Sequence, residues 1–172
     1  MKYILDFDRT ILDTDSLKRK QAEMFGPEVL GTLDSMDGID IESFFFADAV
    51  EFLNTHNMED IYIVTSCVGI TGMWNIEYQK KKLKISGIYK NVNQVFVVSE
   101  SKDKAIKSIP GVETGAVFVD DFTNHLDVVK YMLPDIETVK ITRKDVLKSE
   151  EKSKYKHKEI KLLTELDAII GL

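Results

Sequence analysis

The chain has 172 residues, of which 44% are hydrophobic and 30% are charged, a composition typical of a folded globular protein. The length fits one domain over residues 1–172 with at most a small insert, and the composition excludes a disordered or fibrous chain. The net charge of −6 and the pI near 5.1 argue against nucleic acid as a partner, because they give no overall attraction for its phosphates.

The sequence pattern indicates no targeting to a membrane. The single cysteine, Cys67, cannot form an intramolecular disulfide, which is typical of a reducing compartment. The apolar run at residues 1–5 is interrupted by Asp6 and Asp8, too early for the core of a signal peptide. No stretch approaches the ~20 apolar residues of a membrane span. We therefore expect a cytoplasmic protein with no membrane partner.

The first predicted element is a short buried strand over residues 3–5, followed at once by Asp6 and Asp8. Residues 16–25 have the spacing of a helix. The turn-forming residues that follow, with no clear strand among them, are Gly26, Pro27, Gly31 and Gly38. We therefore expect a small insert at about residues 14–45.

Strand and helix signals alternate along the rest of the chain. Buried strands are predicted at residues 61–64, 95–98 and 116–119, and a strand nearer an edge at residues 138–142. The helices predicted between them cover residues 46–56, 72–83, 104–109 and 123–133. This alternation indicates an α/β fold: a Rossmann-like parallel sheet with helices on both faces, which binds ligands at the carboxyl ends of its strands.

The C-terminal part is rich in lysine between residues 144 and 161. Acidic residues are interspersed, so we interpret this stretch as a solvated loop or helix face. A surface that docks a phosphate backbone is the alternative, and it is the one hint of nucleic acid. Apolar residues from 160 to 170 have the spacing of a short amphipathic helix that packs on the core.

Side chains suited to phosphate chemistry follow the predicted strands. Because the carboxyl ends of parallel strands meet at one rim of the sheet, residues far apart in the sequence converge there. The residues expected at this rim are Asp6, Asp8, Thr65, Ser66, Lys102, Asp120 and Asp121. Lys104 is an alternative to Lys102, which is preferred because it lies at a helix start, where the positive helix end also faces an anion. Such a set forms a site for Mg²⁺ and a phosphoryl group.

The residue types fit phosphoryl transfer, because a phosphate dianion repels a carboxylate nucleophile unless cations neutralise it. Mg²⁺ and Lys102 would neutralise it, and Asp6 could then attack phosphorus to form an aspartyl-phosphate. Asp8 would protonate the leaving oxygen and later deprotonate the attacking water. Thr65, with Ser66 beside it, would bind a non-bridging oxygen of the substrate. The expected metal ligands are Asp6, Asp8 through its backbone carbonyl, Asp120 and Asp121.

The run from residue 3 to residue 12, YILDFDRTIL, resembles the first motif of the haloacid dehalogenase (HAD) superfamily of phosphohydrolases, an apolar strand followed by DxDx[TV]. Residues 61–65, Lys102 with its following helix, and residues 117–121 are similar to the second, third and fourth motifs, in the same order. The resemblance covers residues 1 to about 134 and implies a Rossmann-like core with a mobile cap.

The cap of this family corresponds here to an insert of only about thirty residues, so the resemblance implies a minimal helical cap and an open site. A small phosphorylated metabolite is the expected substrate, and an open site also admits a large phosphorylated one. Asp8 separates the chain from the dehalogenase branch, which lacks the second aspartate and needs no metal. Arg9 stands where Gly is the commoner residue.

The leading prediction is a magnesium-dependent phosphatase that hydrolyses phosphate monoesters. A phosphomutase or a nucleic-acid-end phosphatase of the same family is an open alternative. A non-catalytic phospho-acceptor or binding domain is another, because receiver domains also combine Asp, Thr and Lys on a parallel sheet. Their acceptor aspartate ends the third strand, whereas Asp6 follows the first strand, which favours the enzyme.

Overall fold

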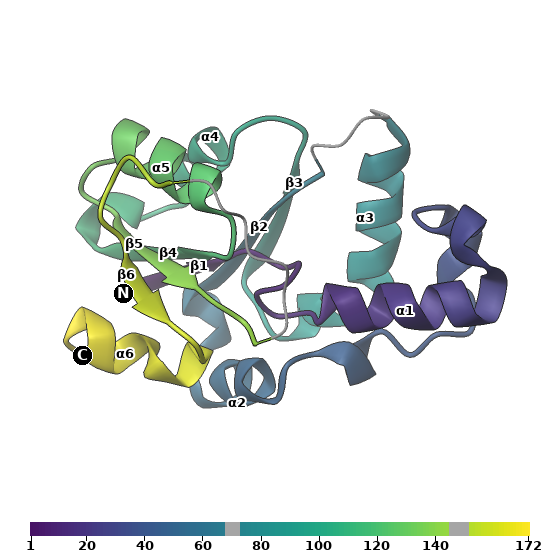
Figure 1. Cartoon of the computed structure of the whole chain (residues 1–172). Coiled ribbons are helices and arrows are strands. Elements are labelled where there is room, and N and C mark those ends of the chain that lie inside the picture. The colour runs from purple at the N-terminus through teal and green to yellow at the C-terminus, as the bar shows by residue number, and fades with distance from the viewer. Residues whose placement is uncertain (68–72, 145–151) are drawn as a thin grey trace.

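A computed structural model of the chain describes residues 1–67, 73–144 and 152–172. A six-stranded parallel sheet forms its centre, with the strand order β3-β2-β1-β4-β5-β6 (Figure 1). The strands are β1 (Lys2–Leu5), β2 (Ile61–Ser66), β3 (Gln94–Val98), β4 (Ala116–Asp120), β5 (Glu137–Ile141) and β6 (Lys158–Ile160). The predicted Rossmann-like α/β fold is therefore confirmed.

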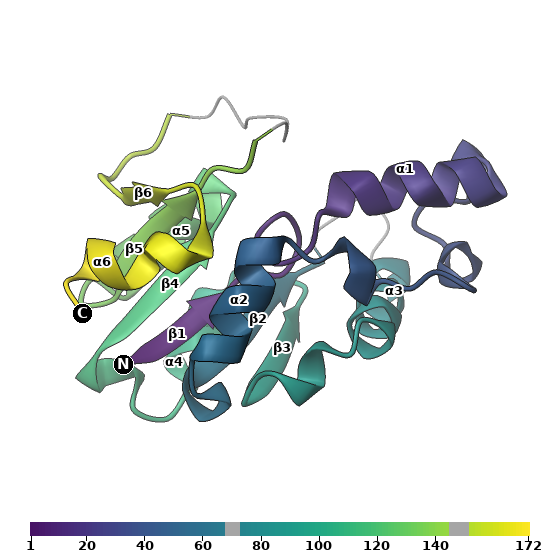
Figure 2. The same cartoon turned by 90° about the horizontal axis from the view of Figure 1, so that it is seen from below.

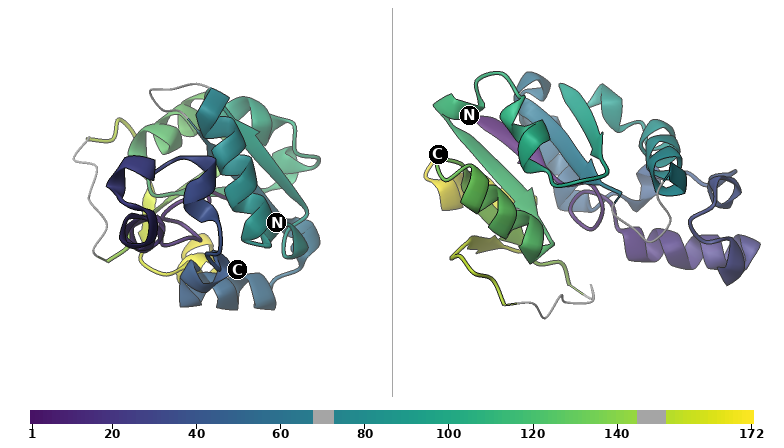
Figure 3. Two further views of the ribbon diagram at one scale, coloured as in Figure 1. Left: turned by 90° about the vertical axis from the view of Figure 1, so that its right-hand side faces the viewer. Right: turned by 90° about the horizontal axis from the view of Figure 1, so that it is seen from above.

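Helices cover both faces of the sheet, as the crossovers between parallel strands require. They are α1 (Thr14–Phe25), α2 (Ala47–Thr55), α3 (Met73–Ile85), α4 (Asp103–Lys107), α5 (Thr123–Met132) and α6 (Leu166–Ile170). Helices α2 and α6 lie over one face (Figure 2), and α4 and α5 lie over the other (Figure 3, right).

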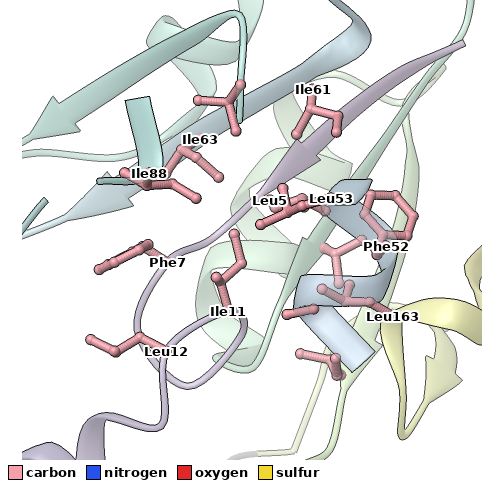
Figure 4. Packing of buried hydrophobic residues seen from close by; sticks show 14 of the residues in the cluster. Leu5, Phe7, Ile11, Leu12, Phe52, Leu53, Ile61, Ile63, Ile88 and Leu163 are labelled. Carbon is pink, nitrogen blue, oxygen red and sulfur yellow. The ribbon is translucent and has the colours of Figure 1, made fainter. Parts of the chain in front are cut away.

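The strand side chains alternate between two apolar cores. Leu5 belongs to the cluster beneath α2, where it packs with Phe52 and Leu53 (Figure 4). Its neighbour Ile4 points the other way, into the cluster that contains Leu126 of α5. Each fully buried Leu, Ile or Phe contributes about 1.5–3 kcal/mol. Burial on both faces holds the strand ends in fixed positions and thus fixes the residues that follow them.

Residues 14–45, for which the sequence predicts an insert, lie beyond the carboxyl ends of the strands, beside α3 (Figures 1 and 3). Their helix α1 begins after Asp13, whose carboxylate accepts a hydrogen bond from the backbone N–H of Ser16 at 2.9 Å. Lys81 of α3 holds the short helix η2 (Leu33–Met36) by donating to the carbonyl oxygen of Leu33 at 2.8 Å. The insert therefore rests on α3.

The C-terminal region differs from the sequence prediction in one element. Residues 158–160 form β6, which pairs with β5, so residues 137–141 are not the edge of the sheet. β6 is only three residues long and mostly charged, and Ile160 alone is buried. The described lysines of the basic stretch are exposed, residues 145–151 lie outside the described part, and a short helix does follow at α6.

Within the described residues, none of the helices combines the length and the apolar character that crossing a membrane requires.

Candidate active site

Three carboxylates meet at the ends of two adjacent strands. Asp6 follows β1, Asp120 ends β4, and the backbone N–H of Asp6 donates to the carbonyl oxygen of Val119 at 2.9 Å. Asp121 comes next in the chain. Carboxylate oxygens of the three acids all lie within 4.8 Å of one another.

Lys102 is the cation of this group. Its ammonium lies 2.5 Å from Asp6 Oδ1 and 2.7 Å from Asp120 Oδ2, and its side chain is 0% exposed. Lys104, the alternative from the sequence, is exposed and pairs with Glu100 at 3.0 Å. Of the two lysines, the structure brings Lys102 to the rim. We call Asp6, Asp120, Asp121 and Lys102 the inner acid cluster.

The inner acid cluster carries more negative than positive charge. Burial, together with the nearby carboxylates of Asp6 and Asp120, raises the pKa of Asp121 to about 8. Burial also raises the pKa of Asp6 to about 6, although Lys102 opposes this shift. For Asp120, burial would raise the pKa, but Lys102 and the contact with His125 together outweigh burial and lower it. Three carboxylates with one ammonium provide the oxygen ligands and the excess charge that suit a hard divalent cation such as Mg²⁺.

Asp8 lies in a separate group of side chains, although it is only two residues from Asp6. Its carboxylate accepts hydrogen bonds from Thr14 Oγ1 at 2.7 Å and from Gln79 Nε2 at 2.7 Å. Lys82 donates to both of its oxygens, at 2.5 and 2.7 Å. Burial would raise the pKa of Asp8, but the Lys82 ammonium and the hydrogen bonds from Thr14 and Gln79 together outweigh burial and lower the pKa to about 2. We call Thr14, Gln79 and Lys82 the Asp8 clamp.

Thr65 and Ser66, at the end of β2, also lie at this rim. Thr65 is buried, and its hydroxyl accepts a hydrogen bond from Gln79 at 2.9 Å. Ser66 Oγ is 3.4 Å from Nε2 of His125, and Nδ1 of the same histidine is 3.0 Å from Asp120 Oδ2. Ser66 therefore connects with the inner acid cluster, whereas Thr65 connects with the Asp8 clamp.

Sequence reasoning did not identify Gln79, Lys82 or His125 as site residues. Gln79 and Lys82 are one helical turn apart, which places them on one face of α3. They stand in the polar run from 79 to 82, which reads as a solvated helix face. His125 follows the acidic pair closely, so its position in the sequence was the one available signal.

Arg9 adopts a backbone conformation that glycine accommodates more easily than other residues do. This agrees with Gly being the commoner residue at this position of the motif that the sequence resembles. The φ of Arg9 is +58°, and among the described residues it is the one non-glycine residue with positive φ. This conformation costs an L-residue roughly 1–2 kcal/mol. Arg9 donates to Asp15 through Nε and Nη2, with a shortest distance of 2.9 Å, and its side chain is 31% exposed. Such a half-exposed ion pair contributes about 0–1 kcal/mol, so it does not by itself offset the strain.

A cavity of about 270 Å³ opens onto these groups. Its lining comprises Asp6, Asp8, Arg9, Thr14, Leu17, Lys18, Ser66, Cys67, Tyr78, Gln79, Lys82, Asp120, Asp121 and His125. A larger hollow of about 620 Å³ lies elsewhere, around Tyr3, His56 and Asp167. Tyr3 and His56 each hydrogen-bond to Asp167, and the site residues predicted from the sequence do not line that hollow. The smaller cavity is therefore the candidate active site.

No protein-family model matches the chain, and no curated protein matches it in sequence. Solved structures do match its fold. The HAD-hydrolase YfnB from Bacillus subtilis, bound to magnesium, has a TM-score of 0.61 at 17% identity, over 99% of this chain and 98% of that one. A dehalogenase with an intermediate complex has a TM-score of 0.60 at 15% identity, over 98% and 96% of the two chains. A HAD-superfamily hydrolase of subfamily IA from Geobacter sulfurreducens has a TM-score of 0.55 at 14% identity, over 98% and 99%.

Proposed function

Because the chain has the fold of the HAD-superfamily hydrolases, we propose that it is a magnesium-dependent phosphatase that hydrolyses phosphate monoesters through an aspartyl-phosphate on Asp6. The observation that carries the proposal is the inner acid cluster. A carboxylate nucleophile there lies beside a buried lysine and two further carboxylates, at the carboxyl ends of adjacent parallel strands.

In this proposal, Asp6, Asp120, Asp121 and the backbone carbonyl of Asp8 hold Mg²⁺, which supplies positive charge for the phosphoryl oxygens when bound. Lys102 adds a second positive charge next to Asp6. Thr65 and Ser66 bind a non-bridging oxygen of the substrate, and Ser66 already faces the cavity.

The reaction has two displacements at phosphorus. An oxygen of Asp6 forms a bond to phosphorus while the bond to the leaving oxygen breaks, and Asp8 gives that oxygen a proton. Water then attacks phosphorus, Asp8 takes a proton from it, and the bond to Asp6 breaks to release inorganic phosphate. Asp8 is a fully hydrogen-bonded carboxylate in the Asp8 clamp. Its acid step therefore requires that these contacts loosen when substrate enters, so that it can gain a proton.

The dimensions of the cavity favour a small phosphorylated metabolite. Ligand sites commonly measure about 300–1,000 Å³, and this cavity of about 270 Å³ is at the lower limit. A large phosphorylated substrate would have to present only its phosphate end. The site also differs from that of the dehalogenase branch, which lacks the second aspartate and needs no metal. Here Asp8 is present, and three further acids form the inner acid cluster.

The test is release of inorganic phosphate from a panel of phosphomonoesters with Mg²⁺ or EDTA, comparing the wild type with Asp6→Asn. Metal-dependent release that is lost in Asp6→Asn is expected. Transfer of phosphate between two positions of one substrate, without net release, would indicate a phosphomutase instead. No reaction with any ester would move the assignment to a phospho-acceptor or binding domain.

A further inference from the structure

Arg9 lines the cavity, and one edge of its guanidinium is paired with Asp15. Its backbone is held in the left-handed region by hydrogen bonds from its N–H to the carbonyl of Leu12 at 2.8 Å and to Thr14 Oγ1 at 3.2 Å. Asp15 binds the Nε and Nη2 atoms of the guanidinium. Among the described residues, Nη1 has no hydrogen-bond partner, so one end of a pre-oriented donor group remains available at the cavity.

The other basic side chains at the cavity are engaged or solvated. Lys82 is 4% exposed and bound to Asp8, and His125 contacts Asp120 and Ser66. Lys18 lines the cavity, but it is exposed, and its long chain is not held in one orientation by a partner within the described residues. Arg9 thus combines a positive charge, a guanidinium paired with Asp15 along one edge and N–H donors without a partner among the described residues.

A guanidinium with a free edge matches the geometry of a carboxylate or phosphate better than a lysine ammonium does. The scissile phosphate is already provided for by the inner acid cluster. We propose that Arg9 binds a second anionic group of the substrate, so that the preferred substrates are phosphate monoesters that carry a carboxylate or a second phosphate close to the ester. This inference rests on the proposed phosphatase function, because these esters are substrates only if the protein hydrolyses them. The contact between Arg9 and an anion can be tested separately by binding.

The probes are the phosphate monoesters of glycolic acid and of 3-hydroxypropionic acid, each compared with its amide, which has nearly the same size but replaces the charged carboxylate by a neutral carboxamide. Binding is measured by calorimetry with Mg²⁺ in an Asp6→Asn background, where turnover is blocked. The variants are Arg9→Gly, which suits the positive φ, and Arg9→Gln, which keeps part of the side chain. Arg19→Gln is the matched control, because Arg19 lies on α1, is not part of the cavity lining and contacts Ser16.

We expect at least one acid to bind about 10-fold more tightly than its amide, as a charge-assisted hydrogen bond allows. In Arg9→Gly and Arg9→Gln this preference should fall to less than about 2-fold, while Arg19→Gln keeps it. Equal binding of acid and amide, absence of binding by both pairs, or loss of the preference in Lys18→Gln rather than in the Arg9 variants would overturn the assignment.

Phosphate release from the same esters by the protein with intact Asp6 separates the two proposals. An acid preference that depends on Arg9 without any phosphate release would leave the Arg9 contact standing and remove the phosphatase proposal. Phosphate release at equal KM from acid and amide would support the phosphatase proposal and overturn the Arg9 contact.

Discussion

Asp6 and Asp8 are two residues apart, yet the structure places them in two groups with opposite electrostatics. Asp6 shares Lys102 with a second carboxylate and has a third beside it, and its pKa rises to about 6. Asp8 has Lys82 to itself, along with two further hydrogen-bond donors, and its pKa falls to about 2. The difference lies in the number of carboxylates that share each lysine.

This comparison separates a group that suits a metal from a group that does not. The inner acid cluster has excess negative charge that a divalent cation would relieve, whereas Asp8 and its clamp together are already neutral and the Asp8 carboxylate is hydrogen-bonded. A pair of acids in one short motif can therefore have different roles, because lysines from different parts of the chain, Lys102 before α4 and Lys82 in α3, neutralise them to different extents.

The largest effect is expected from Lys102→Met. Three carboxylates would remain buried together without their cation, and breaking a buried ion pair in this way costs about 3–5 kcal/mol. Urea unfolding at pH 7 in EDTA measures this loss, and phosphate release should be abolished as well. Lys104→Met is the control, because Lys104 is exposed and should leave both quantities nearly unchanged. A more damaging Lys104→Met would contradict the assignment of the lysine.

Lys82→Met should have the next largest effect. It removes the ammonium that lowers the pKa of Asp8 more than either Thr14 or Gln79 does, so the pKa of Asp8 should rise well above about 2. We expect a loss of roughly 2–3 kcal/mol in unfolding free energy, less than for Lys102 because Asp8 is 27% exposed. Carbon-detected NMR titration of the Asp8 carboxyl measures the pKa shift. Lys81→Met, one residue away and paired with Asp37, should not move it.

A smaller effect should follow from pH at the inner acid cluster. A carboxyl with a raised pKa binds its proton more tightly in the folded state, so the stability it supports is complete below its ordinary pKa near 3.8 and is lost as pH rises to about 8. In EDTA, wild-type stability should fall by about 2 kcal/mol between pH 5 and pH 8, since the three coupled acids share the effect. Asp121→Asn should flatten this slope, and saturating Mg²⁺ should flatten it in the wild type. If the pH dependence of the unfolding free energy were unchanged in Asp121→Asn, other titrating groups would be its cause.

The inner acid cluster was predictable from the sequence because topology alone brings its members together. Buried apolar runs indicate parallel strands, and Asp6 and Asp120 stand at the ends of β1 and β4. The same reasoning failed for β6, whose three residues are too short to show a pattern.

The Asp8 clamp could not be predicted, because it depends on which face α3 turns toward the rim. In the polar run of α3, Gln79 and Lys82 reach Asp8, while Lys81 reaches Asp37 of the insert. A run of consecutive lysines in the sequence does not indicate which of them contacts Asp8 and which contacts Asp37. The orientation of α3 follows from packing between the sheet and the insert, which a local pattern does not contain.

The smallest effect concerns Arg9, which lines the same cavity as the two acid groups and has a strained backbone. Arg9→Ala keeps the cost of a Cβ at positive φ and loses the ion pair with Asp15, whereas Arg9→Gly loses the pair but relieves the strain. Glycine also makes the unfolded chain more flexible, which offsets part of that gain. Arg9→Gly should therefore be more stable than Arg9→Ala by about 1 kcal/mol, measured by urea unfolding at pH 7 with Mg²⁺. If Arg9→Ala were the more stable variant, the left-handed conformation would not hold in solution, and the fixed orientation of the guanidinium would lose its basis.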